Sequence, residues 1–219
     1  MGINICEIDT SNRRLVKEFL ALPYKIYTNI PEWVPPLASD AKLILNRHKH
    51  PYYRHSDATF FLAVDSIGDT VGGLAVQDPQ RYNDYNQTKL SFFCLFECTN
   101  DNEVARRLFE AAIAWARSKK LNQIVGPKGF TVFDGYGVLV KGFEHRPAFG
   151  LPYNPPYYSE IIEYCGFSPE LEIASGYLDS NFDLPEKIVN LSQIIINRRG
   201  LSVRNFRSRR ELRAMIPKL

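Results

Sequence analysis

The sequence predicts an α/β fold in which a mixed, mostly antiparallel sheet is flanked by helices. Three observations carry this prediction. Residues 59–77 read as two strands joined by a tight turn, and residues 89–97 read as a strand dense in Phe and Leu. Residues 102–120 have the apolar periodicity of an amphipathic helix. A hairpin followed by a buried strand and a long helix builds a sheet with helices packed against it.

The N-terminal elements follow from local signals. Residues 3–8 alternate loosely and predict a first strand. Ser11 or Asn12 can cap a helix that follows, because both side chains accept hydrogen bonds from the first free amides. We expect this helix to end at about Leu22, since Pro23 has no N–H to continue the ladder.

The central strands and the long helix have equally local causes. The run at 66–69 is a hairpin turn signal between two apolar runs. Residues 89–97 lack alternation, which is typical of a strand buried on both faces. Asp101 is a good N-cap for the helix 102–120, and residues 123–125 then enter another strand.

Residues 126–153 form a long segment with six glycines and many aromatic residues but no periodicity. Such loops inside a compact domain are often functional, because glycine lets the backbone approach a ligand closely. The alternative is a loop that packs its own aromatic residues over the sheet edge. The candidate pocket residues are Phe130, Phe133, Tyr136, Phe143 and Tyr153.

The C-terminal third predicts shorter elements. A helix begins at Pro155 or Pro156 and ends at Tyr164, before Gly166. Residues 171–178 and 201–207 read as strands, and residues 184–197 read as a helix. Ser208 and Glu211 form a capping box that opens a final amphipathic helix.

Composition bounds the class of protein. The chain has 219 residues, of which 45% are hydrophobic, so it can bury a sizeable core. It lacks an apolar run long enough to span a membrane and a secretory signal pattern. Four cysteines do not make a disulfide framework in a chain of this length. These features predict a cytoplasmic protein that contacts no membrane.

Charge is concentrated at the C-terminus. Residues 197–219 hold eight basic residues and one acid, which leaves the remainder with a net charge of −4. A two-turn helix is marginal in water, so its apolar stripe needs a partner. Three interpretations stay open: the start of a second half, self-association, or contact with an anionic surface such as RNA. Nucleic acid ranks last, because the segment lacks interleaved aromatic residues and any known binding module.

Four segments carry motifs that belong together: FLAV and VGG within residues 60–77, a Phe-rich run at 92–97, the helix 101–120, and EYCGF closing 154–167. In this order they resemble the second to fourth strands, the long helix and the last core helix of the GNAT N-acetyltransferase superfamily. The runs at 50–53, 126–127 and 153–158 (HPYY, GP and YNPPYY) are similar to the N-terminal half of larger, little-characterised bacterial GNAT-like proteins.

The resemblance implies acetyl-CoA as cofactor, with its diphosphate on backbone N–H groups between the Phe-rich strand and the long helix. The corresponding stretch has no glycine and carries Asp101 and Glu103, two carboxylates that repel a diphosphate. An ordinary capped core helix is the alternative interpretation. By resemblance, the cofactor contacts are Cys98, Thr99, Asn100, Asn154 and Tyr158.

The resemblance also implies an acid–base pair. Glu97 corresponds to the family's base at the end of the buried strand, and the alternative is a strand-end carboxylate in water. Ile162 stands where the family has its tyrosine acid. Of the tyrosines nearby, Tyr164 is taken as the candidate acid.

The three histidines at 48, 50 and 55 do not predict a metal site. An H-x-H pair can bind a metal, but no cysteine or acid completes a recognisable ligand spacing. We expect these histidines to form local hydrogen bonds in a polar loop. No metal is therefore expected.

Together these features predict a GNAT-like domain over residues 1–180 and a basic segment over 181–219, for which the start of a second half is one of the three open interpretations. The function they favour is acyl-CoA-dependent N-acylation of a small-molecule amine, or a catalytically degenerate relative of such an enzyme. The alternative is a non-catalytic half that serves as a scaffold for a second GNAT-like domain or another copy.

Overall fold

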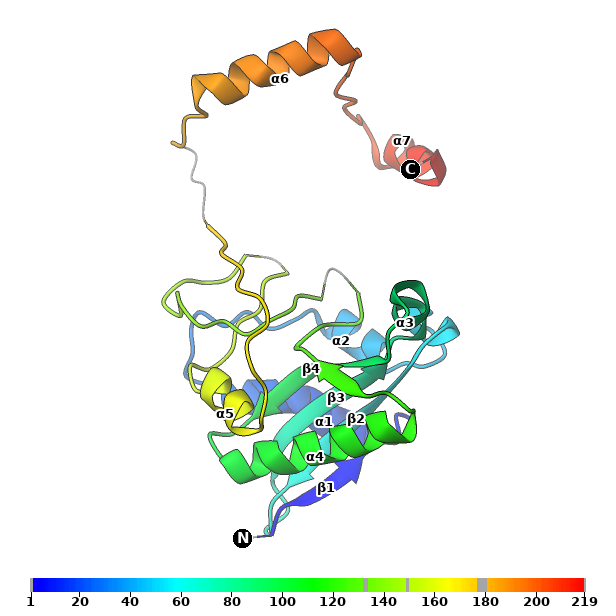
Figure 1. Ribbon diagram of the computed structural model, residues 1–219, viewed down its shortest axis with the longest axis vertical. Coiled ribbons are helices and arrows are strands. Elements are labelled where there is room, and N and C mark those ends of the chain that lie inside the picture. Colours follow the sequence, from blue (N-terminus) through cyan, green and yellow to red (C-terminus); the bar gives the residue numbers. More distant parts are fainter. Residues whose placement is uncertain (1, 132–133, 149, 177–180, 219) are drawn as a thin grey trace. The chain divides into compact units, whose positions relative to one another are not determined.

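The computed structural model describes residues 2–131, 134–148, 150–176 and 181–218 (Figure 1). The chain divides into two compact units, Met1–Pro169 and Glu170–Leu219. The sequence placed this boundary at residue 180. The first unit holds β1 (Asn4–Glu7), α1 (Arg13–Ile26), α2 (Ala38–Ile44), the 3-10 helix η1 (Pro51–Arg54), β2 (Asp57–Val64), β3 (Thr70–Asp78), α3 (Gln80–Asn86), β4 (Leu90–Cys98), α4 (Asn102–Ser118), β5 (Gln123–Val125) and α5 (Tyr158–Tyr164).

The sheet confirms the predicted fold class. Its order is β1-β2-β3-β4-β5, with antiparallel pairs except for the parallel pair β4 and β5. This parallel pairing runs only from Leu90–Gln123 to Phe92–Val125, whereas β4 continues to Cys98. The two strands therefore part halfway along β4 and leave its second half as an open edge.

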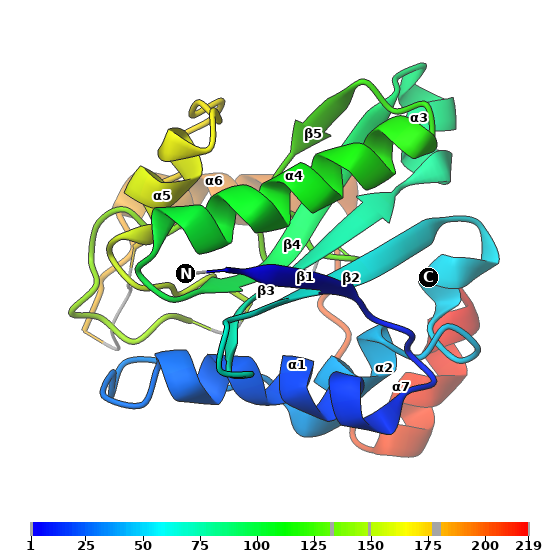
Figure 2. The same ribbon diagram turned by 90° about the horizontal axis from the view of Figure 1, so that it is seen from below.

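Helices cover both faces of the sheet, α4 on one side and α1 on the other (Figure 2). Along β2 the side chains alternate between the two cores, because successive residues of a strand point to opposite faces. Phe61 and Ala63 pack in the cluster that contains α4, and Phe60 and Leu62 pack in the cluster that contains Phe19 of α1. Burial on both faces explains why the strands read as continuous apolar runs.

A β-bulge in β4 decides which way its last residues point. Ala75 pairs with Cys94 and Gly73 pairs with Glu97, so three steps on β4 oppose two on β3. Leu95 takes up the extra residue with a φ of 49°, a left-handed value that is rare for leucine. Beyond the bulge Phe96 joins the α4-side cluster. Glu97 consequently faces the other side, toward the end of α1.

The first helix ends later than predicted. Asn12 caps it by accepting hydrogen bonds from the amides of Arg14 and Leu15, as expected. The predicted stop at Pro23 is wrong, because α1 continues through it to Ile26. Proline removes one ladder bond, but burial of Phe19 and Leu22 on the preceding turns holds the helix. The extra turn brings Tyr27 under the sheet.

The second unit contains α6 (Glu186–Arg199), α7 (Arg209–Met215) and the 3-10 helix η2 (Ile216–Lys218). Ser208 caps α7 through its hydroxyl, as the capping box predicts. The strands predicted at 171–178 and 201–207 are wrong for the described residues, which form no strand there, and residues 177 and 178 lie outside them. A strand requires a neighbour to pair with its backbone, and alternation alone does not supply one. Among the described residues, no helix has both the length and the apolar character that crossing a membrane requires.

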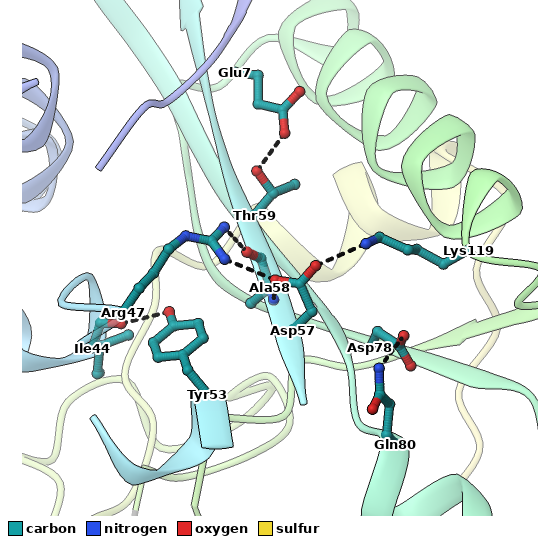
Figure 3. A network of polar contacts seen from close by, with 10 residues as sticks. All are labelled: Glu7, Ile44, Arg47, Tyr53, Asp57, Ala58, Thr59, Asp78, Gln80 and Lys119. Carbon is teal, nitrogen blue, oxygen red and sulfur yellow. Dashed lines mark hydrogen bonds and ion pairs between the residues drawn. The ribbon is translucent and has the colours of Figure 1, made fainter. Parts of the chain in front are cut away.

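An ion-pair network ties the start of β2 to the end of α4 (Figure 3). The Asp57 carboxylate accepts from Arg47 Nη1 and from Lys119 Nζ, each at 2.8 Å. Arg47 also donates to the Ala58 carbonyl and lies over the ring of Tyr53. Burial opposes ionisation of Asp57, but the bonds from Lys119 and Arg47 outweigh it and lower the pKa of this carboxyl.

Candidate active site

A pocket lies where β4 and β5 part. Its volume is about 190 Å³, and it is walled by β4, by the loop that follows β5 and by the residues before α5. The predicted glycine- and aromatic-rich segment therefore does face a cavity. The lining residues used below are Tyr27, Glu97, Phe130, Asp134, Tyr136, Tyr153 and Tyr158.

Glu97 is the central polar group of this pocket. The bulge in β4 turns its side chain into the cavity, where it is half-buried. Tyr158 donates its hydroxyl proton to Glu97 Oε2 at 2.8 Å and accepts the Cys98 amide at 2.9 Å. The alternative of a strand-end carboxylate in water is thus wrong.

Burial changes the acid–base behaviour of this carboxyl. Removal from water disfavours the charged form and raises the pKa of Glu97 to about 7, although the hydroxyls of Tyr158 and Tyr27 oppose the rise. Burial, with the charge of Glu97, also raises the pKa of Tyr158 and of Tyr27 well above the tyrosine range. Near neutral pH both tyrosines are therefore neutral donors, and Glu97 can hold or release a proton.

The predicted aromatic wall is largely present. Phe130, Tyr136 and Tyr153 line the pocket, the predicted Phe143 does not, and Phe133 lies outside the described residues. Phe130 is buried and stacks on Phe60 at 6.2 Å between ring centroids. Tyr153 accepts the Tyr27 hydroxyl at its carbonyl, at 3.3 Å. The segment does both things that the sequence left open, since it packs on the sheet and also walls the cavity.

The structure does not bring Tyr164 to Glu97. Tyr164 ends α5 with 61% of its surface exposed and does not line the pocket. Tyr158, six residues earlier in the chain, is the tyrosine of α5 that bonds to Glu97. Sequence reasoning missed Tyr27 and Asp134, the first because the helix was expected to end before it. An unbroken amphipathic pattern across Pro23 was the available signal.

The predicted cofactor contacts serve internal bonds. Asn154 is buried and holds the loop, because its side-chain oxygen accepts the Leu139 amide at 2.7 Å and its nitrogen donates to the Leu139 carbonyl. The Thr99 amide donates to the carbonyl oxygen of Val71 in β3, at 3.0 Å. Asn100 is exposed, and Cys98 is buried.

The first turn of α4 does not fit the diphosphate of acetyl-CoA. Asp101 caps the helix, and its Oδ1 accepts the amides of Glu103 at 2.8 Å and Val104 at 3.4 Å. A carboxylate therefore occupies two of the amides that a diphosphate would use, and Glu103 adds a second negative charge to the same turn. The interpretation as a capped core helix holds here.

The histidine segment forms local bonds, as expected. His50 is buried and accepts the Tyr52 amide at its Nδ1, at 3.3 Å. Its ring lies edge-on to Phe130, with centroids 5.8 Å apart. The His55 ring nitrogen is 2.9 Å from the Ser56 hydroxyl. The His50 ring thus packs against Phe130 of the aromatic wall.

Comparison with solved structures decides the fold. The aminoglycoside acetyltransferase meta-AAC0020, from an uncultured soil metagenomic sample and solved with trehalose, matches 81% of this chain and 95% of its own at 12% identity, with a TM-score of 0.50. The chain has the GNAT fold. In this GNAT fold the predicted mixed sheet, its parted strands and the helix behind them are all present.

Two curated proteins are similar in sequence to this GNAT-fold chain. One is the bacterial ceramide synthase of Caulobacter vibrioides, 27% identical over 172 residues, which are 78% of this chain and 44% of that protein. The other is Protein YghO of Escherichia coli, 26% identical over 167 residues, which are 76% of this chain and 42% of that protein. The chain thus spans less than half the length of these relatives. No family model matches it.

Proposed function

We propose that the first unit is the acceptor side of an amine N-acyltransferase, with Glu97 as the general base. One observation carries the proposal: a carboxyl with a pKa of about 7 faces a cavity at the parted strands. A base is most effective when its pKa lies near the working pH, because it is then both available and strong enough. Among the described residues that line the cavity, none is lysine, arginine or histidine, so a cationic acceptor meets no like charge.

The proposed chemistry starts from the ammonium form of the acceptor. Glu97 takes one proton from the ammonium, and the freed nitrogen forms a bond to the carbon of an activated acyl group. The bond between that carbon and its leaving group breaks, and the second nitrogen proton departs with the leaving group. Glu97 returns its proton to water. The described residues supply the base, the orientation and a wall of aromatic rings.

Tyr158 is a positioning residue in this scheme. Its hydroxyl bridges the Cys98 amide and Glu97 Oε2, so it fixes the carboxylate relative to the backbone of β4. Its own pKa is raised by burial and by the charge of Glu97, which keeps it protonated as a donor. The bond from Tyr158 favours the charged form of Glu97 and limits the rise in its pKa.

The similarity to the Caulobacter bacterial ceramide synthase supports the same reaction class. A ceramide contains an amide, so its synthesis joins an acyl group to an amine. The aromatic wall of Phe130, Tyr136 and Tyr153 suits an acceptor whose amine sits on an apolar body.

The test uses the purified chain with octylamine and an acyl thioester of N-acetylcysteamine, a small donor without phosphate. Mass spectrometry measures the amide formed. We expect the rate to rise with pH through a midpoint near 7 and to fall at least 100-fold in Glu97→Gln. Glu160→Gln, which removes an exposed carboxylate of α5, is the matched control. Equal rates in Glu97→Gln and the control contradict the proposal.

A second candidate function is a non-catalytic half that pairs with a second GNAT-like domain or another copy. The second unit favours it, because none of its described residues is buried. Its exposed apolar residues on α6 are Ile188, Val189, Leu191, Ile194, Ile195 and Ile196. Apolar surface of this extent marks an interaction site more often than a free surface.

Sedimentation separates this candidate from a monomeric module. The chain is compared with a form that ends at residue 169, since residues 1–169 are a compact unit. Association of the longer form alone supports pairing through the second unit. Two monomers of equal solubility exclude self-association as its role.

A further inference from the structure

The second half of β4 and the first turn of α4 form the place where the fold resemblance puts a diphosphate. Such a site works through unpaired backbone N–H groups and a positive helix end. Here protein acceptors already hold most of these donors. The Cys98 amide donates to Tyr158 Oη at 2.9 Å, the Thr99 amide to the Val71 carbonyl at 3.0 Å, and the Asp101 amide to the Thr99 carbonyl at 2.6 Å. The amides of Glu103 and Val104 donate to Asp101 Oδ1, at 2.8 and 3.4 Å.

The charges around this turn also oppose a phosphate. Asp101 places a carboxylate at the helix end, and the Glu103 carboxylate follows on the first turn. Arg106 on the same helix is already paired, because it donates to both oxygens of Glu103, at 2.8 and 2.6 Å, and pairs with Glu110 one turn later. The helix end is therefore neutralised by the chain itself.

The pocket offers a phosphate no better place. Its described lining includes two carboxylates, Glu97 and Asp134, and no basic side chain. The Lys128 ammonium, from the loop that follows β5, lies over the rings of Tyr82 and Phe92 instead, at 4.4 and 4.2 Å. Recognition in this cavity thus depends on apolar and neutral polar contacts.

We infer that this chain does not bind its acyl donor through a diphosphate. It recognises only the neutral pantetheine thioester part of that donor. A pantetheine arm on another protein satisfies this requirement, because its phosphate need not contact this chain. The nucleotide of free coenzyme A, in contrast, adds no affinity for this chain. The donor class rests on the proposed acyl transfer. The missing diphosphate anchorage rests on β4 and α4 alone.

The first experiment compares two probes on the intact chain by isothermal titration: acetyl-CoA and S-acetylpantetheine. We expect acetyl-CoA to bind no more than about threefold tighter, with no dependence on salt between 50 and 300 mM, because phosphate contacts weaken as salt rises. Absence of binding by both probes overturns the recognition of a pantetheine thioester. A preference for acetyl-CoA of tenfold or more that falls with salt overturns it.

The second experiment restores the site. The double variant Asp101→Gly with Glu103→Ala frees the amides of residues 103 and 104 and removes both carboxylates. We expect its preference for acetyl-CoA over S-acetylpantetheine to rise at least tenfold. Glu110→Ala, which removes a carboxylate further along the same helix, is the matched control and should leave the preference unchanged.

A folding defect in the double variant is covered by Asp101→Asn with Glu103→Gln, since asparagine keeps the cap and loses the charge. This variant should gain a smaller preference of the same sign. No gain in either folded variant overturns the assignment of the carboxylates as the block. Octylamine binding with and without Glu97→Gln, measured in parallel, reports separately on the proposed acceptor site.

Discussion

Glu97 and Asp57 are carboxylates of the same sheet in opposite situations. Asp57, at the start of β2, is held by Arg47 and Lys119, each at 2.8 Å, and its pKa is lowered (Figure 3). Glu97, near the end of β4, faces neutral tyrosine hydroxyls, and its pKa is raised to about 7. The cations beside Asp57 keep its carboxylate charged, whereas the neutral partners of Glu97 leave its proton exchangeable near neutral pH.

Only the carboxylate with neutral partners can exchange a proton near neutral pH. A paired carboxylate fastens two parts of the chain and is charged at every working pH, so Asp57 joins the segment before β2 to α4. A half-buried carboxylate with only neutral partners is costly to ionise, so its pKa is raised. Residues with shifted pKa values are concentrated at functional sites. The neighbouring side chains therefore determine the pKa of each carboxyl on this sheet.

Removal of the Tyr158 hydroxyl should have the largest effect, because it changes both the stability of the fold and the pKa of Glu97. Tyr158→Phe leaves the Cys98 amide without its acceptor and Glu97 without its donor, at a cost of about 2 kcal/mol in the free energy of unfolding at pH 7. The pKa of Glu97 should rise further, because the lost bond had lowered it. Urea unfolding and carbon NMR of the carboxyl measure the two effects. Tyr164→Phe, on an exposed ring, should change neither by a measurable amount.

The pH dependence of stability isolates Glu97. Its folded pKa of about 7 lies above the ordinary value of 4.5, so the folded state binds a proton that the unfolded state releases between these values. The free energy of unfolding should therefore fall by about 2–3 kcal/mol as pH rises from 4.5 to 7. Urea titrations at four pH values measure this slope. Glu97→Gln should remove it, and an unchanged slope in that variant would contradict a raised pKa.

The Asp57 network should give the smallest effect and the opposite sign. Its folded pKa lies below 3.8, so its contribution is complete above that pH and is lost as pH falls through the folded value. Asp57→Asn should cost about 1 kcal/mol at pH 7, since both pairs are partly exposed, and less at pH 3. Thermal unfolding at the two pH values checks this. A larger loss at pH 3 than at pH 7 is incompatible with a lowered pKa.

The sequence alone determined much of the framework. Helix caps are local, so Asn12, Asp101 and Ser208 were readable from the residues beside them. The two-faced strands were readable because full burial removes alternation. The aromatic segment after β5 was recognisable by its glycines, and three of its named residues line the cavity. The predicted domain boundary at residue 180 and the role of the second unit stay predictions.

The geometry of the pocket depends on contacts between residues that are far apart in the chain. Leu95 carries no turn signal, yet its left-handed conformation turns Glu97 away from the α4 core. Tyr27 reaches the pocket because burial of the preceding turns carries α1 through Pro23. Tyr158 replaces Tyr164 because its hydroxyl meets the open edge of β4. Each outcome depends on which strand ends beside which helix. The spacing of residues along the chain does not determine which elements lie side by side in the fold.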